Sequence, residues 1–449
     1  MQTGDELILK IEDFSNLGYG IARVEGFVIF VENSCPQDVV KIKLTKVTKN
    51  YANADVIEII TPSPHRVKPF CAMQKVCGAC QMQFIDYDYQ LELKRQITEE
   101  AMHHIAGLNI EVPLTIASPQ IKEYRHKVQY PVAETKVSKR LLAGYYKQKT
   151  HEIVNIKHCP IQPAICDKII EFIRENAPKY CVSGYNEKKH TGDLRHVVLR
   201  CSTSTGKVLV TLVVNSTKVF ENLKKFANII YEQIPQVVGV CINFNPQKTN
   251  VILGEKSECI CGEDFVEEKI LDKTFKIGSN TFFQVNPKSA ENIFRYVKDY
   301  IKNNLQDAVV LDAYAGVTSF GICISDVCKQ IVSIEENSES VRLGEKIAKE
   351  NGITNIEFHS GDAAEFFKNE TRKFDAVILD PPRKGCTKES LDEAFRLSKE
   401  TIIYVSCNPA TLARDLKILT EKGCRVECIQ PFDMFCHTYH VENVAIIYK

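Results

Sequence analysis

The chain has 449 residues, and its 57 basic and 57 acidic side chains give a formal net charge of zero. With 44% hydrophobic and 25% charged residues, its composition is that of a globular protein, and disordered, collagen-like and membrane classes fit poorly. Zero net charge excludes a wholly basic nucleic-acid binder but not a local basic patch.

Eighteen cysteines is a high number for this length. The first residues show no basic start followed by an apolar stretch, so we expect no secretory signal. No apolar run approaches the roughly 20 residues that span a bilayer. We therefore expect a cytoplasmic, reducing location and no membrane partner. In that setting, clustered cysteines indicate a metal, cluster or catalytic role before they indicate disulfides.

Short strands separated by turns are predicted for residues 1–60, and a proline-containing linker follows at 61–64. Five strands in such a length favour a small β-barrel of the OB type. The expected strands are 7–11, 18–24, 27–31, 39–44 and 54–60.

The rest of the chain changes pattern twice. A helix is predicted over 89–107, where it could pack on the catalytic domain, and mixed α/β structure follows over 121–270. Beyond residue 275, strands alternate with helices, which indicates a parallel, doubly wound sheet with helices on both faces. The strands are 309–313, 330–335, 374–380 and 401–406, and a last strand, 441–448, could join antiparallel. We expect three domains: 1–60, 61–270 and 271–449.

A cofactor crevice is predicted where strand 309–313 runs into the glycine-containing turn 314–321. Ligands of doubly wound sheets bind at the carboxyl ends of the strands. Glu335 ends the second strand and could hold ribose hydroxyls, and Asp362 after the third could accept from an adenine amino group. Thr318 stands where a dinucleotide site needs a second glycine. This disfavours NAD and suits a nucleoside without phosphates, such as S-adenosylmethionine.

A stiff loop is predicted at the same edge of the sheet, where Asp380 is followed by two prolines and Arg383. Because proline fixes φ and removes an amide donor, the shape of this loop is largely set in advance. Such a loop could clamp a planar base and direct Asp380 toward its polar edge.

Cys407 and Glu442 are the candidate catalytic pair. Cys407 ends the fifth strand just before a helix, whose dipole is expected to lower the pKa of the thiol. Glu442 lies within an apolar strand, where an acid needs a reason. A thiolate that adds to C6 of a pyrimidine makes C5 nucleophilic toward a methyl donor, and a carboxylate can then remove the C5 proton.

Residues 275–449 resemble the RNA (uracil-C5)-methyltransferase family. The matching stretches are 282–286, 312–316, 380–385, 406–415 and 440–442. The resemblance implies that Cys407 is the nucleophile and Glu442 the proton acceptor. It also implies a methyl-donor pocket lined by Gln284, Tyr314, Ser319, Glu335, Asp362 and Asp380. At positions 318–319 the family more often has glycine followed by asparagine or threonine.

A second resemblance concerns the N-terminal residues, which are similar to a TRAM domain and so imply RNA binding. The whole layout most resembles the TRAM-containing enzymes that make 5-methyluridine in 23S rRNA, and tRNA is the alternative target. We expect the protein to act as a monomer.

Four cysteines could hold an inorganic centre. Cys71, Cys77 and Cys80 lie within ten residues, and Cys159 follows much later. This spacing suits zinc or an iron–sulfur cluster and does not separate them. It does not match the Cys-x3-Cys-x2-Cys pattern of radical enzymes. The family resemblance extends through residues 77–81 and implies a [4Fe-4S] cluster.

RNA contact is predicted for residues 121–160, which hold nine basic and three acidic side chains with interleaved tyrosines. Tyr124, Arg125 and Lys127 are the most compact group of candidates, because cations follow phosphates and aromatic rings stack on bases. The first 60 residues hold six basic and nine acidic side chains, so contact there should rely on stacking, for example by Tyr19 or Phe30. The target base must leave its stack.

Two other functions are alternatives to uracil methylation. Cytosine-C5 methylation needs a proline–cysteine thiol in the loop after the fourth strand, and Cys386 lies too far beyond Asp380 to match it well. A non-catalytic RNA-binding protein with a cluster would not need Cys407.

Overall fold

The computed structural model describes all 449 residues, which divide into two compact units. The first unit comprises Met1–Gln74, Cys80–Ser118 and Leu379–Lys449, and the second comprises Lys75–Ala79 and Pro119–Ile378. None of the helices combines the length and the apolar character that a membrane crossing requires.

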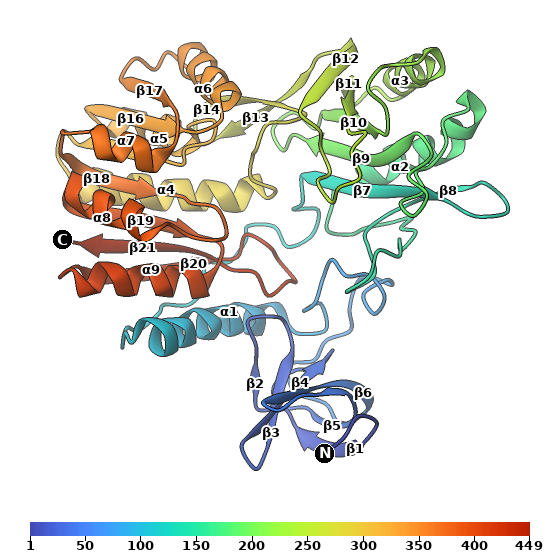
Figure 1. The fold of residues 1–449 in the computed structure, drawn as a ribbon, viewed down its shortest axis with the longest axis horizontal. Helices are drawn as coiled ribbons and strands as arrows, with labels where there is room; N and C mark the ends of the chain where they lie inside the picture. The colour runs from blue at the N-terminus through green and yellow to red at the C-terminus, as the bar shows by residue number, and fades with distance from the viewer. The chain divides into compact units, whose positions relative to one another are not determined.

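The first unit begins with a curled six-stranded sheet in the order β1-β5-β6-β4-β3-β2 (Figure 1). Alternating side chains of these strands point inward, and Ile29, Val31 and Ile42 form part of a fully buried core. The expected strands are present, and the structure adds the short β2. The strands are β1 Glu6–Lys10, β2 Asp13–Phe14, β3 Gly20–Val24, β4 Phe27–Glu32, β5 Val39–Val47 and β6 Tyr51–Thr61.

The predicted helix at 89–107 is present as α1 (Tyr87–Ala101), which continues into one π-helical turn (Met102–Ala106). Asp86 caps its start by accepting from the Tyr89 amide at 2.9 Å. Gly107 ends it with a φ of 72°, a conformation that glycine adopts without a Cβ clash. Within the first unit, α1 contacts α9 and β20, and Figure 1 shows α1 alongside α9.

The C-terminal part of the first unit holds strands β19 (Ser398–Ser406), β20 (Arg425–Phe432) and β21 (Glu442–Tyr448). As predicted, β21 is antiparallel, and it pairs with both β19 and β20. Two helices accompany these strands, α8 (Lys388–Leu397) and α9 (Pro409–Glu421).

A buried ion pair fixes the segment between β20 and β21 to α1. The Lys94 ammonium lies 2.6 Å from an Asp433 carboxylate oxygen, and both side chains are fully buried. The Tyr87 hydroxyl donates to the same carboxylate at 2.7 Å. The His437 carbonyl accepts from the Gln81 and Met82 amides, each at 2.9 Å. These bonds fix the segment that leads to Glu442 at two points, Asp433 and His437.

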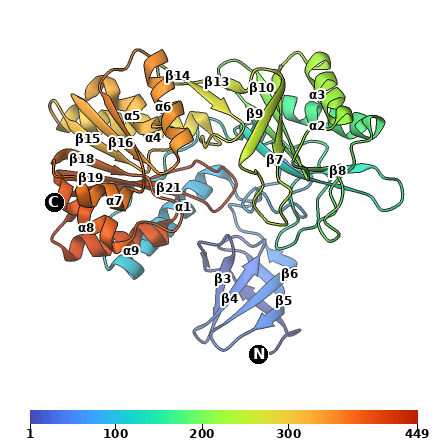
Figure 2. The same cartoon turned by 45° about the horizontal axis from the view of Figure 1, so that its top comes forward.

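The second unit begins with a six-stranded sheet in the order β12-β11-β10-β9-β7-β8. Helices α2 and α3 contact each other and pack on this sheet, as Figure 2 shows. The elements are β7 Lys127–Glu134, β8 Leu141–Ala143, α2 Ala164–Asn176, the 3-10 turn Ala177–Tyr180, β9 Leu194–Cys201, β10 Val208–Val214, α3 Glu221–Gln233, β11 Val237–Phe244 and β12 Lys256–Gly262.

Parallel strands follow, as the alternating pattern predicts: β15 pairs in parallel with β16, and β16 with β17. In the second unit these strands follow the order β17-β16-β15-β18, and in the first unit the order is β19-β21-β20. The remaining elements are β13 Phe265–Ile270, β14 Lys273–Gly278, α4 Pro287–Asn304, β15 Val309–Ala313, α5 Ser319–Ile324, the 3-10 turn Ser325–Val327, β16 Gln330–Glu335, α6 Ser338–Glu350, β17 Ile356–Ser360, α7 Ala363–Asn369 and β18 Phe374–Leu379.

Candidate active site

The candidate catalytic pair lies where two neighbouring strands of the first unit meet. Cys407 follows the end of β19, and Glu442 is the first residue of β21. Because Ser406 pairs with Asn443 in the antiparallel register, the next residue on each strand, Cys407 and Glu442, lie opposite one another. The thiol is half-buried and Glu442 is 8% exposed. The fold therefore places a thiol and a carboxyl group at one edge.

The turn after Cys407 is held by local hydrogen bonds. Asn408 caps α9, because its side-chain oxygen accepts from the Ala410 amide at 3.1 Å. The Ser406 hydroxyl accepts from the Asn408 amide at 3.2 Å. Pro409 occupies the first helical position, where a missing amide hydrogen has no cost. The sequence Ser-Cys-Asn-Pro thus sets a sharp exit from the strand that keeps the thiol at the strand end.

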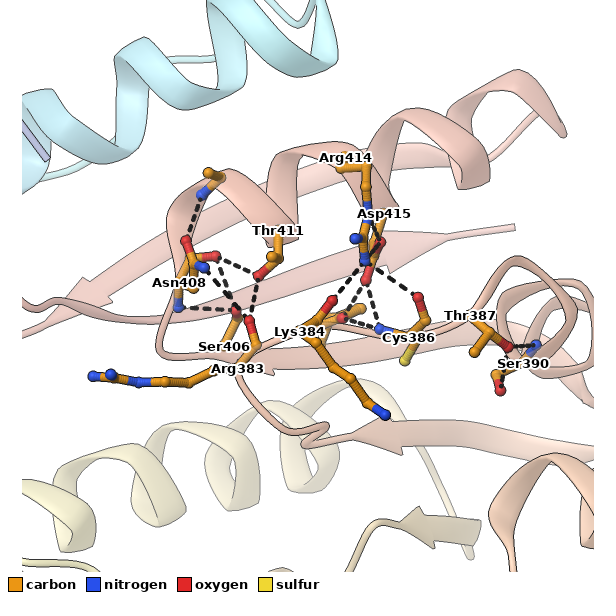
Figure 3. A network of polar contacts seen from close by, with 12 residues as sticks. Arg383, Lys384, Cys386, Thr387, Ser390, Ser406, Asn408, Thr411, Arg414 and Asp415 are labelled. Atoms are coloured by element: carbon orange, nitrogen blue, oxygen red, sulfur yellow. Dashed lines mark hydrogen bonds and ion pairs between the residues drawn. The ribbon is translucent and has the colours of Figure 1, made fainter. Parts of the chain in front are cut away.

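The loop that contains Arg383 lies against the start of α9 (Figure 3). Its carbonyl accepts from the Asn408 side-chain amide and from the Thr411 hydroxyl, both at 3.4 Å. One Arg383 guanidinium nitrogen lies 3.4 Å from Nδ1 of His440. The backbone of this loop is therefore bound to the same helix that follows Cys407.

A buried carboxylate fixes the far end of that loop, as Figure 3 shows. Asp415 of α9 is fully buried and accepts from the Cys386 amide at 2.9 Å and from the Tyr404 hydroxyl at 2.6 Å. Arg414 donates to the Lys384 carbonyl at 2.9 Å. Gly385 has a φ of 75°, and a Cβ there would come within 2.6 Å of both Arg414 and Asp415. The sequence supplies glycine where the loop passes closest to α9.

The Cys407 thiol is harder to ionise than the sequence suggests. Burial raises its pKa to about 11, and the nearby carboxyl groups of Glu442 and Asp380 add to this rise. Arg383 opposes it, both by its charge and by a side-chain hydrogen bond to the sulfur. The expectation that the helix dipole would lower this pKa is wrong for the free protein, because desolvation and two neighbouring acids outweigh it.

The two carboxyl groups of the site also favour their neutral forms. Burial, followed by the neighbouring Asp380, raises the pKa of Glu442 well above its ordinary value, and Arg383 partly opposes this. Burial alone raises the pKa of Asp380 to about 7. A thiol and two acids with strongly raised pKa values in one place are typical of a functional site.

The second unit contains most of the residues expected to line the methyl-donor pocket. Glu335 ends β16 and accepts from the Gly316 and Asn337 amides, each at 2.9 Å. Asp362 caps α7 by accepting from the Glu365 amide at 2.9 Å. These residues lie at the carboxyl ends of parallel strands, where doubly wound sheets bind ligands.

The other expected pocket residues are placed as follows. Tyr314 has a left-handed φ of 60°, and Ser319 is the first residue of α5, in the turn after β15. Gln284 is half-buried in the segment before α4. Asp380 belongs to the first unit, where it acts on Cys407 and Glu442.

The turn after β15 leaves open space beside Glu335. Gly316 has a φ of 58°, and a Cβ at this position would meet nothing within 4 Å. This open space adjoins the Glu335 carboxylate, which holds the Gly316 amide. Thr318 adopts a left-handed conformation as well, with a φ of 60°, and its hydroxyl lies 2.8 Å from that of Ser333. The turn therefore keeps its shape although threonine stands where glycine was expected.

The four cysteines predicted to hold a cluster form no disulfide bond. Cys71 and Cys80 belong to the first unit, and Cys77 and Cys159 belong to the second, so neither unit alone contains more than two of them. No group of three or more His, Cys, Asp or Glu side chains is arranged to hold a metal ion. The donor chemistry suits a cluster, and the cluster itself stays a prediction.

One predicted RNA contact needs correction. Tyr124 is 2% exposed, so its ring cannot stack on a base, and the interleaving of tyrosines with cations did not reveal which of them face inward. Arg125 and Lys127 are half-buried. The Arg125 guanidinium lies 5.3 Å from the centre of the Tyr145 ring. In the N-terminal sheet, Tyr19 lies edge-on to Phe30 at 6.4 Å.

Sequence reasoning missed the parts played by Arg383 and Asp415. Both residues lie in stretches that carried the family resemblance, but neither was given a role. The effect of Arg383 on the pKa of Cys407 depends on a loop that Asp415 holds from about 30 residues further along the chain. A buried aspartate within an apolar helix face was the available signal.

Comparison with known proteins agrees with this geometry. Residues 86–449 match the family model described as tRNA (Uracil-5-)-methyltransferase, and residues 1–57 match the TRAM domain. The chain is 36% identical over 442 residues to a protein of Clostridium tetani described as an uncharacterized RNA methyltransferase, covering 98% of this chain and 95% of that one. A similarly described protein of Synechocystis is 37% identical over 450 residues, covering 99% of this chain and 96% of that one.

A solved structure also resembles the whole chain. The tRNA (uracil-54, C5)-methyltransferase of Pyrococcus abyssi, in complex with S-adenosyl-L-homocysteine, has a TM-score of 0.79 and 27% identity, covering 98% of this chain and 100% of that one.

The methyltransferase fold and the N-terminal TRAM domain define an S-adenosylmethionine-dependent methyltransferase of RNA. The chain belongs to the tRNA (uracil-5-)-methyltransferase family. The predicted fold class and the predicted enzyme class are therefore confirmed.

Proposed function

We propose that the protein methylates C5 of a uracil in structured RNA, with 23S rRNA as the target, through a covalent bond between Cys407 and C6. The observation that supports this most strongly is the pairing of a half-buried thiol with a buried carboxyl group at the ends of β19 and β21. Uracil C5 is too weak a nucleophile to take a methyl group without such help.

Cys407 carries the nucleophilic step. Its thiolate adds to C6, the C5–C6 double bond opens, and the electron pair moves into the ring as an enolate. The Arg383 hydrogen bond to the sulfur favours the charged form and so counteracts the high pKa of the thiol. C5 then has the electron density to accept a methyl group.

Glu442 carries the proton transfer. After C5 is methylated, its hydrogen must leave as a proton, and a carboxylate at hydrogen-bond distance can accept it. The electron pair of that C–H bond re-forms the double bond and expels Cys407. The raised pKa makes Glu442 a stronger base in its ionised form, and the charge of Arg383 favours that form.

The methyl donor is S-adenosylmethionine, which supplies an electrophilic methyl group on a sulfonium. We propose that Glu335 binds the ribose hydroxyls and that Asp362 accepts from the adenine amino group. Gln284, Tyr314, Ser319 and Asp380 line the rest of the pocket. The open space at Gly316 beside the Glu335 carboxylate supports this assignment.

A [4Fe-4S] cluster on Cys71, Cys77, Cys80 and Cys159 is the second part of the proposal. The spacing of the four cysteines, none of which is in a disulfide, and the family resemblance around residues 77–81 support it. Its task would be structural. Protein purified without oxygen should be brown and contain iron and sulfide, whereas a colourless protein with one zinc would favour the zinc alternative.

The setting of the reaction is also inferred. We propose three domains, over residues 1–60, 61–270 and 271–449, acting as a monomer in the cytoplasm. Eighteen cysteines without a disulfide support a reducing compartment. The TRAM match at residues 1–57 supports RNA binding by the first domain.

The target RNA decides between two candidates. The TRAM-containing layout supports 23S rRNA, and the likeness to a Pyrococcus tRNA (uracil-54, C5)-methyltransferase favours tRNA. Mass mapping of 5-methyluridine in ribosomal and transfer RNA from a deletion strain tests this directly. Loss of the modification from 23S rRNA alone supports the proposal, and loss from tRNA alone assigns the second candidate.

Two further experiments test the proposed chemistry. Uridine-only and cytidine-only RNA, supplied with labelled donor, distinguish uracil from cytosine as the base, and label in cytidine alone would overturn the uracil assignment. A non-catalytic RNA-binding role requires that Cys407→Ala keep full biological activity, whereas we expect that variant to have no turnover.

A further inference from the structure

Two cations face each other in the sheet of the second unit. Lys127 of β7 and Arg200 of β9 are direct cross-strand partners in the antiparallel register. Like charges directly opposite one another destabilise a sheet, since their side chains start only about 5 Å apart. Such a destabilising pair therefore indicates a function other than holding the sheet together.

Burial increases the cost of this pair. Arg200 is 4% exposed, and its Nε atom is buried without a hydrogen-bond partner. Burial lowers the pKa of Arg200 to about 10. Burial, together with the charges of Arg200 and Arg125, lowers the pKa of Lys127 to about 7. The charged groups that act on Lys127 are both cations, and no carboxylate is among them.

Only part of the Arg200 guanidinium has a hydrogen-bond partner in the protein. One terminal nitrogen donates to the Thr281 carbonyl, while Nε is left without a partner. Arg125 makes other contacts. Its Nε donates to the Lys127 carbonyl at 3.3 Å, and its guanidinium lies over the Tyr145 ring. A buried, unsatisfied donor beside a second cation is costly, and a nearby anion would offset part of that cost.

The place of the pair in the unit suggests which anion. Arg200 binds the Thr281 carbonyl, and the His126 amide donates to the Val285 carbonyl at 2.7 Å. These two bonds bracket Gln284, which is expected in the methyl-donor pocket. The cations therefore lie beside a loop of the expected methyl-donor pocket, to which the proposed function brings an RNA backbone.

We propose that Lys127 and Arg200 form a seat for one phosphodiester of the RNA backbone beside the loop 281–285. This inference rests on the proposed function, because it takes RNA as the ligand. The phosphate would accept from the Lys127 ammonium, and its charge would offset the repulsion between Lys127 and the buried Arg200. The pair would thus be costly in the free protein and favourable in the complex.

Lys127→Met tests the seat, because it keeps the bulk of the side chain and leaves Arg200 in place. Removing one of two facing cations should raise the melting temperature by about 2 °C, and binding of a fluorescent stem–loop RNA with unpaired uridines should weaken about tenfold. The salt dependence of log K should also become shallower by about 0.7 to 0.9, the value for one phosphate contact. The matched control, Lys224→Met, removes an exposed cation of α3, outside the basic stretch 121–160, and should change neither property.

A second measurement identifies the phosphate. Single phosphates of the RNA are replaced in turn by uncharged methylphosphonates, without methyl donor. One position should weaken binding to the wild type but have no further effect on Lys127→Met. A variant with unchanged salt dependence, or a scan in which every loss is the same in both proteins, would overturn the seat. Inorganic phosphate that stabilises the wild type as much as the RNA does would also overturn it, in favour of a free-anion site.

These outcomes are separate from the test of the proposed function. Wild-type protein that makes 5-methyluridine while Lys127→Met binds RNA with the wild-type salt dependence refutes the seat alone. Wild-type protein that binds RNA but makes no 5-methyluridine refutes the proposed reaction. RNA binding by the wild type and by Lys127→Met can still be compared in that case.

Discussion

At the scale of single residues, Arg383 is the cation that acts on the nucleophile. It lowers the pKa of Cys407 by its charge and by a hydrogen bond, against a rise to about 11 that burial and two acids cause. Arg383→Met should therefore raise that pKa further and slow thiolate chemistry about tenfold at pH 8, since one pKa unit is a factor of ten in the ionised fraction.

Alkylation of the Cys407 peptide, followed by mass spectrometry across a pH series, measures this effect apart from the other cysteines. Arg383→Lys should recover part of the reactivity because it keeps the charge. The exposed neighbour Lys384 provides the control, and Lys384→Met should leave the profile in place. An Arg383→Met profile that coincides with the wild type would show that the guanidinium does not act on the sulfur.

Asp380 gives a pH dependence of stability. Burial raises its pKa from an ordinary 3.8 to about 7, so the folded protein holds the proton more tightly than the unfolded chain. Its contribution is fully present below pH 4 and is lost as the pH rises through about 7, at up to about 1.4 kcal/mol per pH unit.

Asp380→Asn removes this loss. The free energy of unfolding of the variant should exceed that of the wild type at pH 8, and the difference should shrink as the pH falls toward 4. Urea unfolding at a series of pH values measures it. A difference that does not vary with pH would contradict the raised pKa of this half-buried carboxyl group.

At the scale of elements, the loop 380–386 owes its position to α9. Gly385 has a φ of 75°, and a Cβ there would clash with Arg414 and Asp415 at 2.6 Å. Gly385→Ala should cost about 2 kcal/mol or more of stability from strain and clash together. It should also slow adduct formation, because Arg383 moves with the loop.

Gly352→Ala is the matched control, since Gly352 has a φ of 70° but a Cβ there would meet nothing within 4 Å. That variant should show the conformational cost of about 1 kcal/mol alone and normal chemistry. Chemical unfolding and adduct kinetics on both variants separate strain from clash. Equal effects of the two substitutions would show that contact with α9 does not position the loop.

Helix α1 holds the segment that leads to Glu442 through the Lys94–Asp433 ion pair. Both side chains are fully buried, so removing one partner leaves an uncompensated charge. Lys94→Met should cost about 3 kcal/mol or more of stability. The double variant Lys94→Met/Asp433→Leu should recover much of this loss, because it removes the orphaned carboxylate as well. A double variant as unstable as the sum of the two single changes would rule out coupling between them.

At the scale of the whole molecule, the sequence predicted the elements with strong local signals. Strands 309–313 and 330–335 were placed correctly, because apolar runs between turn residues define buried parallel strands. The start of β19 was missed, because Ser398, Lys399 and Glu400 are polar although they extend the strand. The helix α1 was recognised with a start two residues late.

Properties that depend on distant parts of the chain were not visible in the sequence. The helix after Cys407 suggested a low pKa, but burial and the approach of Glu442 from another strand decide its direction. Tyr124 was assigned to a surface because local composition does not reveal which side of a segment faces the core. Likewise, the pairing of Lys127 with Arg200 appears only when β7 and β9 come together.

The central claim is a transient bond between the Cys407 sulfur and uracil C6, released with the help of Glu442. The most direct measurement is the intact mass of Glu442→Gln after incubation with substrate RNA and methyl donor, followed by nuclease digestion. We predict a protein that carries a methylated uridine nucleotide in Glu442→Gln and an unmodified protein in Cys407→Ala/Glu442→Gln. No adduct on Glu442→Gln, or an adduct that persists without Cys407, would contradict the account.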